Sequence, residues 1–272
     1  MNPRTLLGAR GLRPKKSLGQ NFLMDPGTSG RIARLTVDAP GDRVLEIGAG
    51  TGSLTAALAA AGADLTAFDL DDSLVDILRS REDLAAVRIE HGDALEYDFG
   101  AYAGTAPWRV AGNLPYNIAT PLLIRLVQMD RPPDRIVAMI QKDVADRLLA
   151  RPGSAAYGSL TIAISLHFRV ERGMNVSPGQ FFPRPKVVSS VVVLHRLDAP
   201  VVPVRDRKRF EQVVRGAFAY RRKTLANSLA LALELPRERI AGALAALDLA
   251  ADIRGEALDL RTFVALTDAL DD

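Results

Sequence analysis

The chain has 272 residues, of which 48% are apolar, and a formal net charge of +3 at pH 7. This length and apolar content suit one large globular domain, with or without a smaller one beside it. Because cysteine is absent and the three histidines lie far apart, disulfides and thiolate metal sites are excluded, and we expect no metal. No apolar run approaches the roughly 20 residues that span a bilayer. The polar, basic residues 1–16 also lack the apolar segment of a signal peptide, which predicts a cytoplasmic protein.

Basic residues gather in two parts of the chain. The first cluster contains Arg10, Arg13, Lys15 and Lys16, and the second contains Arg205, Arg207, Lys208, Arg209, Arg215, Arg221, Arg222 and Lys223. Clusters of this kind indicate a polyanionic partner such as a nucleic acid. The alternative is that arginine-rich helices simply solvate a surface.

The first predicted helix begins at Asp25-Pro26, an N-cap followed by proline at the first helical position. A strand at 43–47 then leads into Gly48-Ala49-Gly50-Thr51-Gly52 and a helix at 53–61. These glycines allow a sharp turn and let a ligand approach the positive end of the helix. Their spacing is GxGxG and not the GxGxxG of dinucleotide sites, which argues against an NAD-dependent oxidoreductase.

Polar residues follow several successive strands. The predicted strands 43–47, 64–68, 87–90 and 108–112 are followed by Gly48, Asp69, Asp93 and Asn113. Open α/β sheets bind ligands beyond the carboxyl ends of their strands, so we expect these residues to converge on one crevice. An acid at the end of the second strand suits ribose hydroxyls, and the next acid suits an adenine amino group. Taken singly, either acid could instead cap a helix.

The tetrapeptide Asn113-Leu114-Pro115-Tyr116 carries the predicted chemistry. The Asn113 amide oxygen and the Leu114 carbonyl can accept the two hydrogens of an exocyclic amine, while the Tyr116 ring stacks on the base. Acceptors that favour a more tetrahedral nitrogen lower the barrier to its attack. The pattern therefore predicts a methyltransferase that acts on the amine of a nucleobase.

The remaining segments complete the predicted fold. We expect helices at 118–129 and 141–148, strands at 136–140, 159–170 and 187–194, and, after a change of composition near Pro200, helices at 206–220, 223–233, 237–247 and 259–270. The fold class is α/β: a Rossmann-like class I methyltransferase with a mostly parallel seven-stranded sheet flanked by helices, and a smaller C-terminal all-α domain. The predicted boundaries are 1–24 for a basic arm with a cofactor-pocket segment, 25–199 for the methyltransferase domain and 200–272 for a helical RNA-binding domain.

A proline-stiffened loop at 177–186 holds two aromatic rings and the cations Arg184 and Lys186. We expect Phe181 to be exposed and to sandwich a flipped base against Tyr116, and Phe182 to be packed. We also expect Tyr157 to be packed and leave it out of the site.

Several motifs together resemble the ribosomal RNA small-subunit adenine dimethyltransferase family, nearly from end to end. They are Lys16-Ser17-Leu18-Gly19-Gln20-Asn21-Phe22-Leu23, Glu46-Ile47-Gly48-Ala49-Gly50-Thr51-Gly52, Gly92-Asp93-Ala94, Asn113-Leu114-Pro115-Tyr116-Asn117-Ile118, Phe182-Pro183-Arg184-Pro185-Lys186-Val187 and Phe218-Ala219-Tyr220-Arg221-Arg222-Lys223-Thr224-Leu225. The resemblance implies dimethylation, with S-adenosylmethionine as the cofactor, of two adjacent adenosines in the hairpin near the 3′ end of 16S rRNA. It also implies that this occurs late in assembly of the small ribosomal subunit.

The resemblance also implies roles for individual residues. The cofactor would be bound by Asn21, Leu23, Gly48, Gly50, Asp69, Asp93 and Asn113; the target base would be handled by Asn113, Leu114, Tyr116 and Phe181. RNA would be bound by Arg13, Lys15, Lys16, Arg184, Lys186, Arg221, Arg222 and Lys223. Two departures from the family pattern are Asp69 in place of the usual Glu and Arg184 inside the usual triple proline. We expect a monomer without metal and a weaker or water-bridged contact of Asp69 with the ribose.

Two other functions remain as alternatives. One is a macrolide-resistance adenine methyltransferase, which has the same fold and chemistry but acts on 23S rRNA of the large subunit. Leu114 and the segments around Asn21, Arg184 and Arg222 favour the small-subunit enzyme over it. The other is a mainly non-catalytic RNA-binding assembly factor, against which the intact glycine loop and the Asn113 tetrapeptide argue.

Overall fold

The computed structural model describes residues 2–271, which form two compact units. Unit 1 comprises residues 2–145 and 170–196, and unit 2 comprises residues 146–169 and 197–271. The sequence-based boundaries placed 146–169 in the methyltransferase domain, whereas this segment packs with the C-terminal helices. Within residues 2–271, no helix is both long and apolar enough to cross a membrane.

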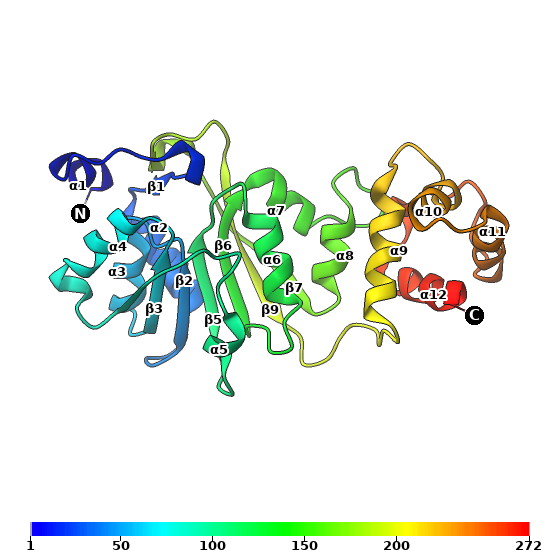
Figure 1. Ribbon diagram of the computed structural model, residues 1–272, viewed down its shortest axis with the longest axis horizontal. Coiled ribbons are helices and arrows are strands. Elements are labelled where there is room, and N and C mark those ends of the chain that lie inside the picture. Colours follow the sequence, from blue (N-terminus) through cyan, green and yellow to red (C-terminus); the bar gives the residue numbers. More distant parts are fainter. Residues whose placement is uncertain (1, 272) are drawn as a thin grey trace. The chain divides into compact units, whose positions relative to one another are not determined.

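A seven-stranded sheet with the strand order β4-β3-β2-β5-β6-β9-β7 forms the centre of the α/β part (Figure 1). The strands are β2 (Arg43–Ile47), β3 (Asp64–Asp69), β4 (Arg88–His91), β5 (Arg109–Asn113), β6 (Arg135–Gln141), β7 (Phe168–Val176) and β9 (Ser189–Arg196). Strands β2 to β6 are mutually parallel and β9 is antiparallel to β6. The mostly parallel α/β fold expected from the sequence is thereby confirmed.

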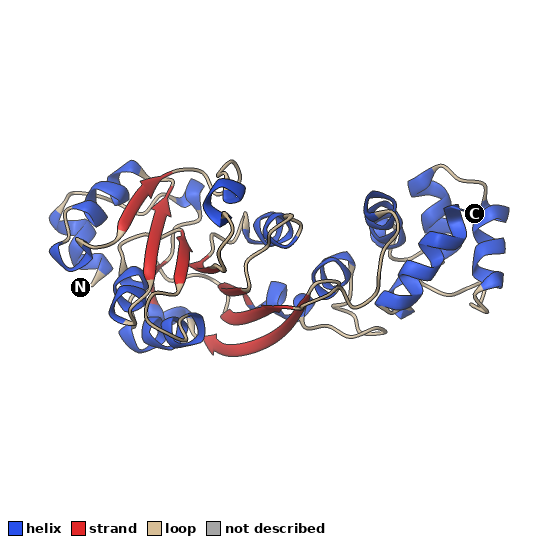
Figure 2. Cartoon of the chain, turned by 90° about the horizontal axis from the view of Figure 1, so that it is seen from below, coloured by secondary structure: helices blue, strands red, loops and turns tan. Residues whose placement is uncertain are grey.

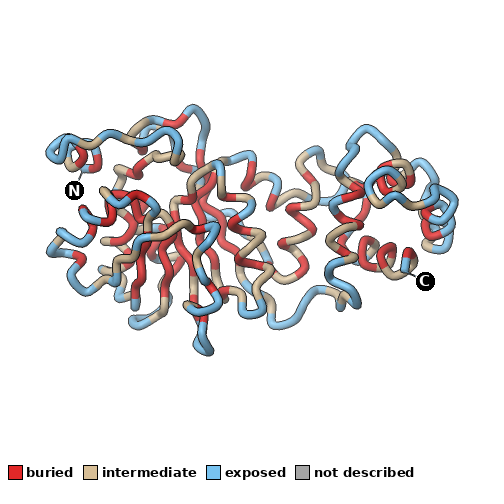
Figure 3. Tube along the Cα trace, viewed as in Figure 1, coloured by how far each residue is buried: buried red, intermediate tan, exposed pale blue. Residues whose placement is uncertain are grey.

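Helices cover both faces of this sheet (Figure 2). The helices of this part of the chain are α2 (Pro26–Thr36), α3 (Ser53–Ala60), α4 (Asp72–Arg79), α5 (Phe99–Ala103), α6 (Ala119–Val127) and α7 (Lys142–Leu148). The central strands are accordingly buried along almost their whole length (Figure 3). Helix α2 begins as the sequence indicates, because the Asp25 carboxylate accepts a hydrogen bond of 2.8 Å from the Thr28 backbone N–H.

The segment before α2 is more structured than the predicted arm. It contains α1 (Pro3–Ala9), a 3₁₀ turn at Lys16–Leu18 and β1 (Phe22–Leu23). Strand β1 pairs antiparallel with β8 (Phe181–Phe182), so that the N-terminal segment and the proline loop form a small second sheet. Leu7 of α1 is buried with Phe22 and with residues of α4.

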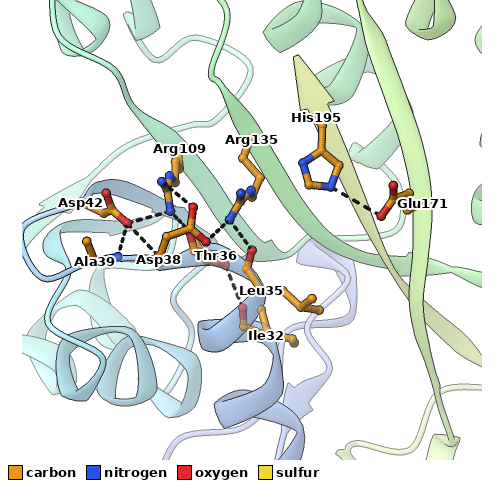
Figure 4. A network of polar contacts seen from close by, with 10 residues as sticks. All are labelled: Ile32, Leu35, Thr36, Asp38, Ala39, Asp42, Arg109, Arg135, Glu171 and His195. Atoms are coloured by element: carbon orange, nitrogen blue, oxygen red, sulfur yellow. Dashed lines mark hydrogen bonds and ion pairs between the residues drawn. The ribbon is translucent and has the colours of Figure 1, made fainter. Parts of the chain in front are cut away.

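Two arginines at the amino ends of β5 and β6 bind the end of α2 and the loop after it (Figure 4). Arg109 donates to the Thr36 carbonyl at 2.6 Å and forms ion pairs with Asp38 and Asp42 at 2.9 and 2.7 Å. Arg135 also pairs with Asp38, at 2.7 Å, and its hydrogen bond lowers the pKa of that carboxyl. Since ligands of open α/β sheets bind at the opposite, carboxyl ends, we assign this network to stability.

Unit 2 is helical and has its own core. Its helices are α8 (Ser159–Ser165), α9 (Arg207–Ala219), α10 (Leu225–Leu233), α11 (Arg237–Ala246) and α12 (Leu260–Asp271). The strand predicted at 159–170 is wrong over residues 159–165, which form α8, and right over residues 168–170, which belong to β7. β-branched residues favoured a strand there, but Ile162 and Leu166 pack as a helical pair against the cluster that contains Phe210 and Phe263, and this packing outweighs propensity. Tyr157 is buried in the same cluster, as expected.

Candidate active site

A pocket lies at the carboxyl ends of β2, β3, β4 and β5. Four residues at or within two residues of these strand ends all line it: Gly48, Asp69, Asp93 and Asn113. Residues 18–22 of the N-terminal segment form another part of its wall. The structure thus brings together polar groups that the chain separates by up to 65 residues (113 minus 48).

The glycine loop lies at the start of α3, and two of its glycines face the pocket. Gly48 and Gly50 have φ angles of +72° and +59° and line the cavity, so the backbone is exposed to a ligand there without a Cβ. Gly52 has another role. A Cβ at this position would lie 2.6 Å from Arg81 Nη1 and 2.8 Å from Leu78 Cδ2. Glycine at position 52 therefore leaves room for the side chains of Leu78, in α4, and Arg81, just after α4.

Two ionisable side chains lie near this loop, Arg81 in space and Glu46 in the sequence just before it. Arg81, held by Asp83, donates from Nη1 to the Thr51 carbonyl at 2.7 Å. Glu46 is 1% exposed, and its Oε2 has no hydrogen-bond partner among the described residues. Burial, together with the nearby charge of Asp69, raises the pKa of the Glu46 carboxyl to about 8. The strand that leads into the loop therefore carries a buried carboxyl that favours its neutral form.

The two acids at the pocket are positioned by backbone N–H groups. Asp69 accepts from Gly50 N at 2.8 Å and from Asp71 N at 3.0 Å, while burial raises the pKa of its carboxyl. Asp93 accepts from Leu95 N through Oδ1 at 2.8 Å, which leaves Oδ2 for a ligand. Both side chains therefore offer fixed acceptor atoms, which suit hydroxyl or amino groups.

Asn113 ends β5, and a residue far away in the sequence orients its side chain. Its Nδ2 donates to the backbone carbonyl of Asn21 at 2.7 Å. Because that carbonyl can only accept, the amide orientation is fixed, and Oδ1 is the atom left to accept from a substrate. Leu114 and Pro115 follow in the pocket wall. The Pro115 carbonyl accepts from the first residues of α6, which holds the turn in place.

Tyr116 and Phe181 do not form the expected pair. The Tyr116 hydroxyl lies 2.7 Å from Ser189 Oγ, and burial raises the pKa of the phenol. Phe181, which we expected to be exposed, is 2% exposed and packs in the core with Leu23 and Val176. Phe182, expected to be packed, is the more exposed of the two rings. The expectation for Phe181 is therefore wrong, because pairing of β8 with β1 turns this ring inward. Phe182 is half-buried and packs against the cluster that contains Leu7 and Phe22, as expected.

In the N-terminal segment, Asn21 lines the pocket but Leu23 does not. Leu23 is 4% exposed and belongs to the same core cluster as Phe181. The neighbouring Phe22 lines the pocket instead and packs on Gly50, where a Cβ would lie 3.0 Å from its ring. Of the two residues predicted in this segment, Asn21 therefore lies at the pocket and Leu23 lies in the core.

The pocket also contains apolar residues that were not predicted from the sequence. Leu70 and Leu95 are 44% and 40% exposed, and both line the pocket together with Ile118. Each leucine follows one of the acids, directly after Asp69 or two residues after Asp93. A large apolar residue just after the acid at a strand end is the sequence signal that could have predicted these pocket residues. Such exposed surfaces suit a flat aromatic ring.

All eight predicted RNA-binding cations are exposed: Arg13, Lys15, Lys16, Arg184, Lys186, Arg221, Arg222 and Lys223. The Nζ of Lys15, however, lies 2.7 Å from Asp71 Oδ1. Arg221 donates to the Ala155 carbonyl at 2.7 Å. Both of these side chains therefore have partners within the protein.

The fold and the pocket define a class I methyltransferase that uses S-adenosylmethionine. The chain matches the family model for ribosomal RNA adenine dimethylase over residues 11–251, and it belongs to that family. Small subunit methyltransferase A of Geobacter metallireducens is 46% identical to it over 265 residues, 96% of each chain. The Pseudomonas aeruginosa protein of the same name is 42% identical over 260 residues, 95% of each chain.

Solved structures agree with this assignment. A dimethyladenosine transferase from Plasmodium falciparum superposes with a TM-score of 0.77 at 27% identity, over 90% of this chain and 95% of that chain. The 23S rRNA methyltransferase ErmE superposes with a TM-score of 0.69 at 25% identity, over 92% of this chain and all of that chain (100%).

Proposed function

We propose that this protein dimethylates the N6 amines of two adjacent adenosines in the 3′-terminal hairpin of 16S rRNA during maturation of the small ribosomal subunit. The observation that carries the proposal is the fixed Asn113 amide, whose Oδ1 is available as an acceptor at the edge of the cofactor pocket. The small-subunit relatives at 42% to 46% identity support the choice of substrate.

The residues of the pocket fit S-adenosylmethionine. The backbone at Gly48 and Gly50 is open to a ligand, the Asp69 oxygens suit a ribose diol, and Asp93 Oδ2 suits the adenine amino group. Leu70 and Leu95 present apolar surface for the adenine ring. When bound, S-adenosylmethionine supplies a methyl group on a positively charged sulfur.

The protein's part in the transfer is to hold and polarise the target amine. Asn113 Oδ1 and the Leu114 carbonyl accept its two hydrogens, which favours a more tetrahedral nitrogen with an available lone pair. Tyr116 lies three residues further on and offers its ring for stacking. Ser189 anchors the hydroxyl of that ring. Because Phe181 is in the core, we do not assign it a stacking role.

We propose that the exposed cations bind the phosphates of the RNA and that the helical unit is the main RNA-binding part. The hairpin would be selected by shape and backbone contacts more than by base edges. We also propose that the protein acts as a monomer in the cytoplasm. Sedimentation equilibrium of the free protein tests whether it is a monomer.

The direct test is transfer of labelled methyl groups from S-adenosylmethionine to small subunits that lack the modification, with large subunits in parallel. We expect dimethyladenosine at two adjacent positions of 16S rRNA. Label in large subunits alone would establish the 23S rRNA activity instead. Cofactor binding without transfer to either subunit would establish an assembly factor that does not catalyse.

A further inference from the structure

The cofactor pocket is partly covered by a segment with little regular structure. This segment, residues 15–22, is called the strap here; Leu18, Gly19, Gln20, Asn21 and Phe22 of the strap line the pocket. Its regular structure is limited to one 3₁₀ turn and the first residue of β1. Its position over the pocket therefore depends on side-chain contacts with the rest of the unit.

Asp71, just before α4, provides the main polar contact. Its carboxylate is 5% exposed and accepts from Lys15 Nζ at 2.7 Å and from Gln20 Nε2 at 2.9 Å. Gln20 Oε1 in turn accepts from the Lys15 backbone N–H at 2.7 Å, which closes a ring of three residues. Burial opposes ionisation of Asp71, but the hydrogen bonds from Lys15 and Gln20 outweigh it and lower the pKa of the carboxyl.

This contact lies between two functional groups. On one side, the Asp71 backbone N–H donates to Asp69 Oδ1, on the acid assigned to the ribose. On the other side, Gln20 precedes Asn21, whose carbonyl orients the Asn113 amide. A shift of the strap would therefore disturb the pocket wall and the catalytic amide together.

We propose that Asp71 is a positioning residue, which fastens the strap over the cofactor and, through Gln20 and Asn21, keeps Asn113 aligned for methyl transfer. This inference rests on the proposed function only for the transfer step. The effect on the strap and on cofactor affinity is independent of the RNA substrate.

The test compares Asp71→Asn with Asp76→Asn, which removes the same charge from an exposed position on α4. An Asn side chain has one acceptor oxygen and turns its NH₂ toward a donor, so either Lys15 or Gln20 loses its partner. We expect the Kd for S-adenosylmethionine to rise roughly tenfold in Asp71→Asn and to stay unchanged in Asp76→Asn. Amide hydrogens of residues 16–22 should exchange faster only in Asp71→Asn.

A further readout separates positioning from general stability. At saturating cofactor, single-turnover transfer to small subunits should still be several-fold slower in Asp71→Asn, with both variants melting at the same temperature. Adding Lys15→Ala to Asp71→Asn should change cofactor affinity and strap exchange little further, because both substitutions act on the same contact between Lys15 and Asp71. Unchanged affinity and strap exchange in Asp71→Asn, or fully additive effects of the two substitutions, would overturn the inference. If the wild type transfers no methyl group, the proposed function fails, while affinity and exchange still test the strap.

Discussion

The side chain of Asn113 is held by the backbone of Asn21, 92 residues earlier in the chain, through a hydrogen bond of 2.7 Å. This contact joins the end of a central strand to the strap across the pocket. It uses the amide's donor and leaves its acceptor free for substrate. The geometry of the catalytic group is therefore set by a part of the protein that also covers the cofactor.

Asn113→Ala should reduce methyl transfer at saturating cofactor by about 10²–10³-fold, because it removes an acceptor that acts in the transition state. Affinity for RNA should remain close to that of the wild type. Single-turnover kinetics with small subunits and a filter-binding assay measure the two quantities. Asn175→Ala, at an exposed position of β7, is the matched control. Transfer within a few-fold of wild type would remove Asn113 from the mechanism.

Glu46→Gln should stabilise the protein by an amount that grows with pH. The folded Glu46 carboxyl has a pKa of about 8, against the ordinary value of 4.5. Between these values the unfolded chain releases a proton that the folded protein retains, so the stability of the wild type falls as pH rises from about 5 to 8. The Gln variant lacks this loss. The difference in free energy of unfolding between the variant and the wild type can therefore grow by up to about 1.4 kcal/mol per pH unit.

Urea unfolding at pH 5, 6, 7 and 8 gives the difference in free energy of unfolding between wild type and variant. Glu96→Gln, at an exposed position, controls for the substitution itself. A difference that stays constant over this range would show that Glu46 is ionised in the folded protein.

Gly52→Ala should destabilise the protein more than Gly153→Ala. The two glycines have nearly equal φ angles of +83° and +82°, so both substitutions bring similar backbone strain, about 1 kcal/mol. Only the Cβ at position 52 would collide with neighbours, Arg81 Nη1 and Leu78 Cδ2. We expect overpacking to lower the free energy of unfolding of Gly52→Ala by about 1–3 kcal/mol more than that of Gly153→Ala. Equal losses in urea unfolding would mean that Arg81 moves aside without cost.

The sequence predicted the parts of this fold that depend on local signals. Strands β2, β3 and β5 begin and end within about one residue of the expected limits, because apolar β-rich runs are followed directly by a glycine or a polar residue. The rule that ligands bind at the carboxyl ends of parallel strands then placed Asp69, Asp93 and Asn113 together without any knowledge of the third dimension.

The errors concern partners that are distant in the sequence. Successive residues of a strand point to opposite faces, so only the register of β8 with β1 decides that Phe181 and not Phe182 enters the core. The basic cluster indicated an RNA contact for Lys15, and nothing near it in the sequence indicated its ion pair with Asp71, 56 residues away. Residues 159–165 form a helix because of packing within unit 2. None of these outcomes follows from local periodicity.

Replacing Arg222 and Lys223 together with Ala should weaken RNA binding and flatten its salt dependence. Both side chains are exposed and lie in the connection between α9 and α10. Each lost phosphate contact should lower the slope of log affinity against log salt by about 0.7–0.9. Arg237→Ala, at another exposed position in the same unit, is the control. Binding of a 16S rRNA 3′-terminal hairpin between 50 and 200 mM salt measures the slopes, and a slope equal to that of the wild type would place the RNA on other cations.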